Sequence, residues 1–209
     1  MRYMNASPKS RKPNRLKGYD YTQAGCYFVT VCAQDRRCLF GDIIEDQMVL
    51  NEAGMMVAHW WSKTESKFPH VDLGEYVLMP NHIHGIVVIV GADPRVRPHD
   101  KDPESSKDER IEQRQQEEHQ QDGFQNQGGH MGPPLQEIIQ WFKTMTTNEY
   151  IKEVKTGRFP PFEKRIWQRS FYDHVIRDDD DLGRIREYIQ NNPLQWAIDE
   201  ENPAYRVVP

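Results

Sequence analysis

Apolar runs separated by short polar turns predict several β-strands in this chain. Strands are expected at residues 26–32, 71–79, 82–90 and 173–177, and a short hairpin at 43–50. The first of these runs is rich in β-branched and aromatic residues, which favours a central strand. Pro80-Asn81 lies between two of the runs, where it predicts either a tight turn or a kink in one longer ribbon.

Three other segments carry apolar residues at helical spacing. Helices are predicted at 52–67, at 135–154 and from Leu182 to about Asn191. Asn51 stands at the N-cap position of the first helix, and the acidic run 178–181 precedes the last one, where the helix dipole favours negative charge. Pro193 is expected to end the last helix, since the residue before a proline avoids the α region. Both strands and helices are therefore expected in this chain.

The net charge of −5 over 209 residues is distributed unevenly. The first 17 residues hold six basic and no acidic side chains, which is typical of a phosphate-binding arm, although a merely soluble terminus is an equal alternative. Residues 92–132 hold ten acidic and six basic side chains, so this segment supplies most of the negative charge. Its composition predicts a disordered insert over 91–134, with a solvated helix within 108–121 as the alternative.

Composition and motifs bear on the compartment in which the protein is expected. No run of some 18 apolar residues is present, and the basic start lacks an apolar signal segment, so we expect a cytoplasmic protein without a membrane span. Cys26, Cys32 and Cys38 lack a Cys-x-x-Cys spacing, which favours reduced thiols.

His82 and His84 lie two residues apart in a predicted strand and therefore share one face, while Ile83 points to the other. Two imidazoles on a rigid strand are candidate ligands for a divalent metal ion. The alternative is a pair of polar residues on the wet face of an edge strand.

Arg184, Tyr188 and Asn192 follow the i, i+4, i+8 spacing and form one column on the last helix. Tyr188 is a candidate nucleophile and Asn192 a candidate metal ligand, with Gln190 or Asn191 as replacements for Asn192. A phenol with a pKa near 10 needs a neighbouring cation to lose its proton, which fits attack on a phosphodiester. The alternatives are a half-buried tyrosine and a helix-capping asparagine.

Aromatic and basic residues are interleaved around Trp167. The basic residues are Lys164, Arg165 and Arg169. Bases stack on rings and phosphates meet cations, so this pattern suits single-stranded nucleic acid. Aromatic packing beneath a loop is the alternative.

Taken together, several motifs resemble those of the REP-associated tyrosine transposases, which belong to the HUH single-tyrosine transposases. The similarity covers about residues 14–90 and 135–197. It rests on Tyr19-Asp20-Tyr21, Gly25, Tyr27-Phe28-Val29-Thr30, Met79-Pro80-Asn81-His82-Ile83-His84, Trp167-Gln168, Phe171-Tyr172-Asp173-His174-Val175-Ile176-Arg177 and Tyr188-Ile189-Gln190-Asn191-Asn192-Pro193. The 91–134 insert has no counterpart in that pattern.

The resemblance implies an α+β fold, with a ferredoxin-like or RRM-like antiparallel sheet and helices packed on one face. It implies Mg²⁺ or Mn²⁺ on His82 and His84, with Tyr188 attacking single-stranded DNA to leave a 5′-phosphotyrosine and a free 3′-OH. The expected partners are hairpins formed by REP-like palindromes. A monomer is favoured, and a dimer that exchanges the tyrosine helix is the alternative.

On this basis the chain divides into a basic arm (1–17), one catalytic domain (18–200) interrupted by the insert, and a tail (201–209). The expected DNA-binding residues are Arg11, Lys12, Arg15, Lys17, Trp167, Arg169 and Arg184. Tyr172 is a second candidate nucleophile, but only Tyr188 has a helix-spaced amide partner. His174 belongs to the shared motifs and either orients the metal site or fills space.

Two other functions compete with a transesterase. One is a hairpin-binding protein that keeps the site but seldom uses it. The other is an RRM-like RNA-binding module, which predicts exposed aromatic residues on the sheet and binding that is indifferent to EDTA.

Overall fold

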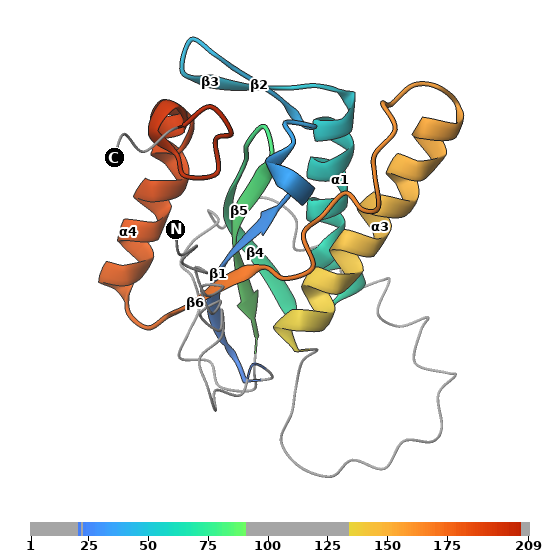
Figure 1. Ribbon diagram of the computed structural model, residues 1–209. Coiled ribbons are helices and arrows are strands. Elements are labelled where there is room, and N and C mark those ends of the chain that lie inside the picture. Colours follow the sequence, from blue (N-terminus) through green and yellow to red (C-terminus); the bar gives the residue numbers. More distant parts are fainter. Residues whose placement is uncertain (1–20, 22, 91–133, 206–209) are drawn as a thin grey trace, which may run out of the picture.

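A four-stranded antiparallel sheet forms the centre of the computed structural model, which describes residues 21, 23–90 and 134–205 (Figure 1). The sheet has the order β4-β5-β1-β6 and consists of β1 (Gly25–Cys32), β4 (Val71–Leu78), β5 (His82–Ile89) and β6 (Tyr172–Ile176). All eight residues of β5 are buried, and so are all but the end residues of β1. A separate hairpin is made of β2 (Gly41–Ile44) and β3 (Gln47–Leu50).

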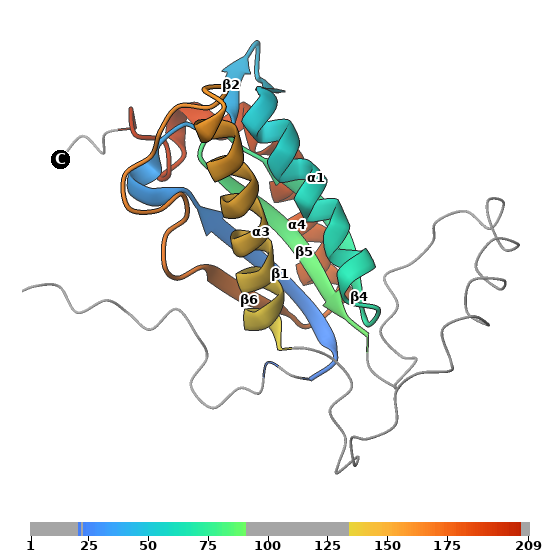
Figure 2. The ribbon, with the colours of Figure 1, turned by 90° about the vertical axis from the view of Figure 1, so that its right-hand side faces the viewer.

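Two helices, α1 (Glu52–Lys67) and α3 (Leu135–Lys155), lie side by side on one face of the sheet (Figure 2). The third helix described, α4 (Asp179–Asn191), lies on the opposite face (Figure 1). Both predicted N-caps are confirmed: the Asn51 side chain accepts a hydrogen bond from the Gly54 N–H at 2.9 Å. The Asp178 carboxylate accepts one from the Asp181 N–H at 2.8 Å.

Without the hairpin, the elements follow the order β-α-β-β-α-β of ferredoxin-like folds. This confirms the predicted α+β class and antiparallel sheet. The position of α4 adds to the prediction, because this helix covers the face that α1 and α3 leave open. Phe28 and Ile86 point to that face and pack with Ile189 of α4.

Alternate residues of the strands supply two hydrophobic cores. The larger core lies under α1 and α3 and includes Val29, Ile83 and Val87, together with Trp61 and Phe142 from the helices. The smaller core lies under α4. Thr30 of β1 and His82 and His84 of β5 lie on the same face of the sheet as this smaller core.

The connection between β4 and β5 is a tight turn, with the Met79 N–H bonded to the His82 carbonyl at 2.8 Å. This decides between the two predicted arrangements of Pro80-Asn81. The basic arm and the acidic insert fall on residues 1–20 and 91–133, which lie outside the described residues. In the described ranges, no helix combines the length and the apolar character that crossing a bilayer demands.

Candidate metal and tyrosine site

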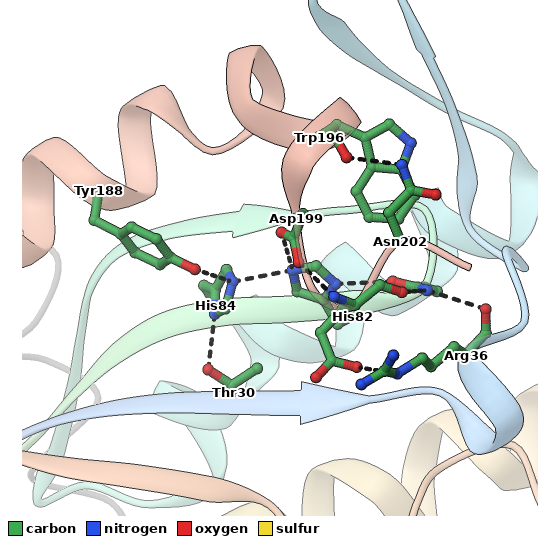
Figure 3. Close-up of polar contacts among 10 residues, drawn as sticks. Thr30, Arg36, His82, His84, Tyr188, Trp196, Asp199 and Asn202 are labelled. Carbon is green, nitrogen blue, oxygen red and sulfur yellow. Dashed lines mark hydrogen bonds and ion pairs between the residues drawn. The ribbon is translucent and has the colours of Figure 1, made fainter. Parts of the chain in front are cut away.

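Strand β5 points His82 and His84 toward the α4 side of the sheet, as the two-residue spacing predicts. Their Nε2 atoms lie 3.0 Å apart, and both side chains are buried (Figure 3). Because β5 lies between β4 and β1, the alternative of a wet edge strand is wrong.

The hydrogen bonds around His82 fix the protonation of its ring. The Asn81 Nδ2 donates to the backbone carbonyls of Arg36 and Glu201 at 3.0 and 2.7 Å, so the Asn81 Oδ1 is left facing His82 Nδ1 at 2.8 Å. An amide oxygen can only accept, which places the proton on Nδ1 and leaves Nε2 with a free lone pair. His84 Nδ1 lies 2.8 Å from the Thr30 hydroxyl. Oxygen partners of this kind orient metal-binding histidines.

Burial keeps both imidazoles uncharged. It lowers the pKa of His82 to about 3, with the Asn192 side chain acting in the opposite direction. It also lowers the pKa of His84 well below its ordinary value, and His82 adds to this effect. Neutral imidazole is the form that binds metal ions. The Nε2 of His82 carries no proton and lies 3.0 Å from the Nε2 of His84. At this distance a proton or a cation must lie between the two nitrogens.

Tyr188 reaches this pair from α4. Its Oη lies 3.2 Å from His84 Nε2, and its ring meets Phe28 edge-on at a centroid distance of 5.9 Å. Burial raises the pKa of the phenol, and the carboxylate of Asp199 raises it further. Tyr188 is therefore a neutral phenol at pH 7 and needs a cation to act as a nucleophile.

Asn192 keeps helical geometry, with φ −59° and ψ −42°, in spite of the following proline. The α-helix ends at Asn191, as Pro193 predicts, and the chain continues as a 3₁₀ helix, Pro193–Ile198, with the proline at its first turn. The Asn192 side chain is buried beside His82 and Tyr188, and its Oδ1 accepts no hydrogen bond of ordinary geometry from the described residues.

Asp199 is the site residue that the sequence did not reveal. Its Oδ2 lies 3.9 Å from His82 Nε2, and ligand atoms of His82, His84 and Asp199 all lie within 4.8 Å of one another. The 3₁₀ helix and a turn in which the Glu201 N–H donates to the Asp199 carboxylate at 2.7 Å bring it there. The backbone carbonyl of Glu201 and the side chain of Asn202 also hold this end of the site through hydrogen bonds.

These donors fit a divalent cation. Two neutral imidazole nitrogens, the orphaned amide oxygen of Asn192 and the carboxylate of Asp199 are ligand types that Mn²⁺ and related ions accept. An orphaned buried acceptor next to the unprotonated Nε2 of His82 is costly unless a cation or a proton donor satisfies it. The burial of Asp199 raises the pKa of its carboxyl, so a cation there would also offset this desolvation.

A pocket of about 550 Å³ opens in front of the pair and includes Thr30, His84, Tyr188 and Asn192 in its lining. Tyr172 also lines this pocket, but in the described part of the chain it makes no hydrogen bond to the histidines. His174 is turned to Asp181, with its Nε2 2.8 Å from the carboxylate.

The three described residues expected to bind DNA lie in different surroundings. Trp167 is buried against Phe40 and Phe142, and its Nε1 donates to Thr146 at 2.8 Å, which fits packing beneath a loop. Arg169 is exposed beside the pocket region, and Arg184 is exposed on α4 next to Asp181. The expected residues Arg11, Lys12, Arg15 and Lys17 lie outside the described residues.

Comparison with known proteins finds a relative that matches most of the chain. No protein-family model matches the chain. An uncharacterized protein of Haemophilus influenzae is 34% identical over 205 residues, which cover 94% of this chain and 95% of that protein. The chain belongs to the same family as this protein.

A second Haemophilus influenzae protein bears the name of a REP-associated tyrosine transposase. It is 38% identical over 65 residues, 30% of this chain and 37% of that protein, which confirms the resemblance seen in the motifs. A solved structure of a REP-associated tyrosine transposase bound to a REP hairpin aligns over 87% of this chain and 73% of its own, at 18% identity and a TM-score of 0.47.

Proposed function

We propose that this protein is a transposase-like DNA-processing enzyme that cleaves and rejoins single-stranded DNA beside palindromic hairpins. The observation that carries the proposal is the approach of Tyr188 Oη to within 3.2 Å of His84 Nε2, beside two neutral imidazoles and an orphaned amide oxygen. A hydroxyl nucleophile next to a cation site is the arrangement that phosphodiester transesterification requires.

In the proposed reaction the Tyr188 oxygen attacks the scissile phosphorus while the bond to the 3′ oxygen breaks. The phenol proton leaves to solvent in the open pocket, and the 3′ oxygen takes a proton from solvent. The products are a 5′-phosphotyrosine and a free 3′-OH, and rejoining is the reverse. The energy of the broken ester stays in the new one, so no nucleotide cofactor is consumed.

His82 and His84 would hold a Mg²⁺ or Mn²⁺ ion through their Nε2 atoms, with Asn192 and Asp199 as oxygen ligands. When bound, such an ion supplies polarisation of the phosphate and stabilisation of the leaving oxygen. Asn81 and Thr30 orient the two rings through their Nδ1 atoms. Phe28 packs against the rings of both His84 and Tyr188, which positions the phenol over the pair.

The alternative of an RRM-like RNA-binding module has less support. Phe28, the aromatic residue of β1 on the site face, is buried under α4, so that face is not free to stack on bases in the manner of an RRM.

Covalent capture tests the proposed function. The protein is incubated with single-stranded DNA that carries a labelled hairpin and its flanks, in the presence of Mn²⁺, and is then separated on a denaturing gel. A labelled protein–DNA adduct is expected, and it should disappear in EDTA and in Tyr188→Phe.

Tyr172→Phe is the matched control, because Tyr172 is an exposed tyrosine that lines the same pocket. It should form the adduct as the native protein does. An adduct that survives Tyr188→Phe would exclude Tyr188 as the nucleophile. If the native protein binds the hairpin but forms no adduct, the result would favour the alternative of a hairpin-binding protein that seldom uses its catalytic site.

A further inference from the structure

Two further grooves adjoin the site pocket. One, of about 350 Å³, lies between α3 and the segment 165–169; the other, of about 760 Å³, lies between that segment and residues 34–36. Arg165 and Arg169 line both grooves. Gln168 lines both and also the site pocket, and Ser170 lines the site pocket and the larger groove. The three hollows therefore lie next to one another, and Tyr188 lines the site pocket among them.

The charge along this surface changes sign. Asp199, Glu200 and Glu201 line the site pocket, where a cation would offset them. Arg165 and Arg169 are exposed in the grooves, and neither forms an ion pair with any residue that the structure describes. Asp35 also lines the larger groove, but Arg36, Arg165 and Arg169 leave it with an excess of positive charge. This excess favours an anionic ligand, and the planar guanidinium groups suit phosphate.

Residues 168–170, which lie between the grooves and the site pocket, are held in place by several hydrogen bonds. The buried Lys143 of α3 donates from Nζ to the carbonyls of Gln168 and Ser170, each at 3.1 Å, and lies over the Phe171 ring. The Gln168 N–H bonds to the Cys32 carbonyl at the end of β1 at 2.9 Å. Rigid support of this kind lowers the entropy that binding costs.

We propose that this arginine groove, defined by Arg165, Arg169 and Gln168, binds the sugar–phosphate backbone of single-stranded DNA next to the phosphate that Tyr188 attacks. The inference rests on the proposed function. The His84 ring next to the Tyr188 hydroxyl is buried. The phosphate that Tyr188 attacks must therefore enter the pocket, which requires a strand that is not paired with a complementary strand. The face of α3 that lines the smaller groove offers uncharged polar groups for sugars and base edges, namely Gln140, Thr144, Thr147 and Asn148.

The experiment uses two DNA probes that share one hairpin, of which only one has a single-stranded extension. In Arg165→Ala/Arg169→Ala, affinity for the extended hairpin should fall about tenfold or more, while affinity for the blunt hairpin stays unchanged. The salt dependence of binding to the extended probe should also fall, by about 1.4 in log–log slope for two lost phosphate contacts. Arg165→Lys/Arg169→Lys keeps both charges and should retain the native slope.

Lys63→Ala/Lys67→Ala is the matched control, since it removes the same charge from exposed positions of α1 that line neither groove. It should bind both probes as the native protein does. Equal loss on both probes, or no loss on either, in the arginine variant would overturn the groove proposal. Adduct formation by the native protein is read separately, so failure of the groove and failure of the tyrosine chemistry give different results.

Discussion

At the level of single residues, Asp199 supplies the negative charge that the neutral histidine pair lacks. A carboxylate in reach of two neutral imidazoles strengthens binding of a divalent cation, because it adds charge as well as a ligand atom. Asp199→Asn should therefore weaken Mn²⁺ binding by roughly tenfold to a hundredfold, as measured by electron paramagnetic resonance of free Mn²⁺.

Glu200→Gln is the control for this change, because Glu200 lines the same pocket but is not part of the three-residue cluster. It should bind Mn²⁺ with nearly native affinity. If both substitutions weakened binding equally, Asp199 would act only through the general charge of the pocket.

Cys32 lines the site pocket but is a poor nucleophile. Burial, with a further contribution from Glu201, raises the pKa of its thiol from 9.0 to about 12. The thiolate fraction at neutral pH is thus roughly a thousandfold below that of an ordinary thiol, and alkylation should be slower by a similar factor. The rate of iodoacetamide labelling, followed by mass spectrometry of the Cys32 peptide, should rise about tenfold per pH unit because only the thiolate reacts.

Labelling in denaturant is the control, since unfolding removes the desolvation that raises the pKa. Fast labelling of Cys32 in the native protein at neutral pH would show that this thiol is ionised and available to chemistry in the pocket.

At the level of elements, β5 holds the histidines in place partly because Trp61 of α1 packs directly on Gly85. A Cβ at position 85 would overlap the buried Trp61 ring. Gly85→Ala should lower the free energy of unfolding by about 1 to 3 kcal/mol, the usual cost of overpacking, as measured by urea denaturation.

At Gly183 in α4, by contrast, substitution by alanine is expected to stabilise the protein. A Cβ there would meet no atom within 4 Å, and the residue is exposed in the helix that carries Tyr188. Gly183→Ala should raise the free energy of unfolding by about 0.5 to 1 kcal/mol because it lowers the backbone entropy of the unfolded chain. A loss of stability in this variant would indicate that α4 needs freedom at Gly183.

At the level of the whole molecule, local patterns predicted the strands and α-helices that the structure describes, but neither 3₁₀ helix and only some of the contacts between elements. The His82–His84 pair and the Tyr188–Asn192 column follow from strand and helix periodicity, so the sequence was enough to name them. Asp199 is brought to His82 by a 3₁₀ helix and a turn, which no spacing rule relates to β5. The side of the sheet that α4 covers likewise depends on packing with Phe28 and Ile86, and periodicity within α4 does not reveal it.

The same tertiary packing bears on the oligomeric state. Tyr188 reaches His84 of its own chain, so the proposed site is complete within one molecule. A monomer, the state that the sequence analysis favours, should therefore be able to form the adduct. Mixing two inactive variants, Tyr188→Phe and His84→Ala, tests this point on the denaturing gel.

If each site is built within one chain, the mixture stays inactive, because no molecule holds both the phenol and the histidine pair. If α4 is exchanged between two copies, one of the two composite sites in a mixed dimer regains both groups, and an adduct appears on the His84→Ala chain. Since the two variants can be made to differ in mass by a tag, the gel also identifies the chain that carries the DNA. An adduct in the mixture would show that the contact between α4 and β5 within one chain is replaced by a contact between chains when DNA is cleaved.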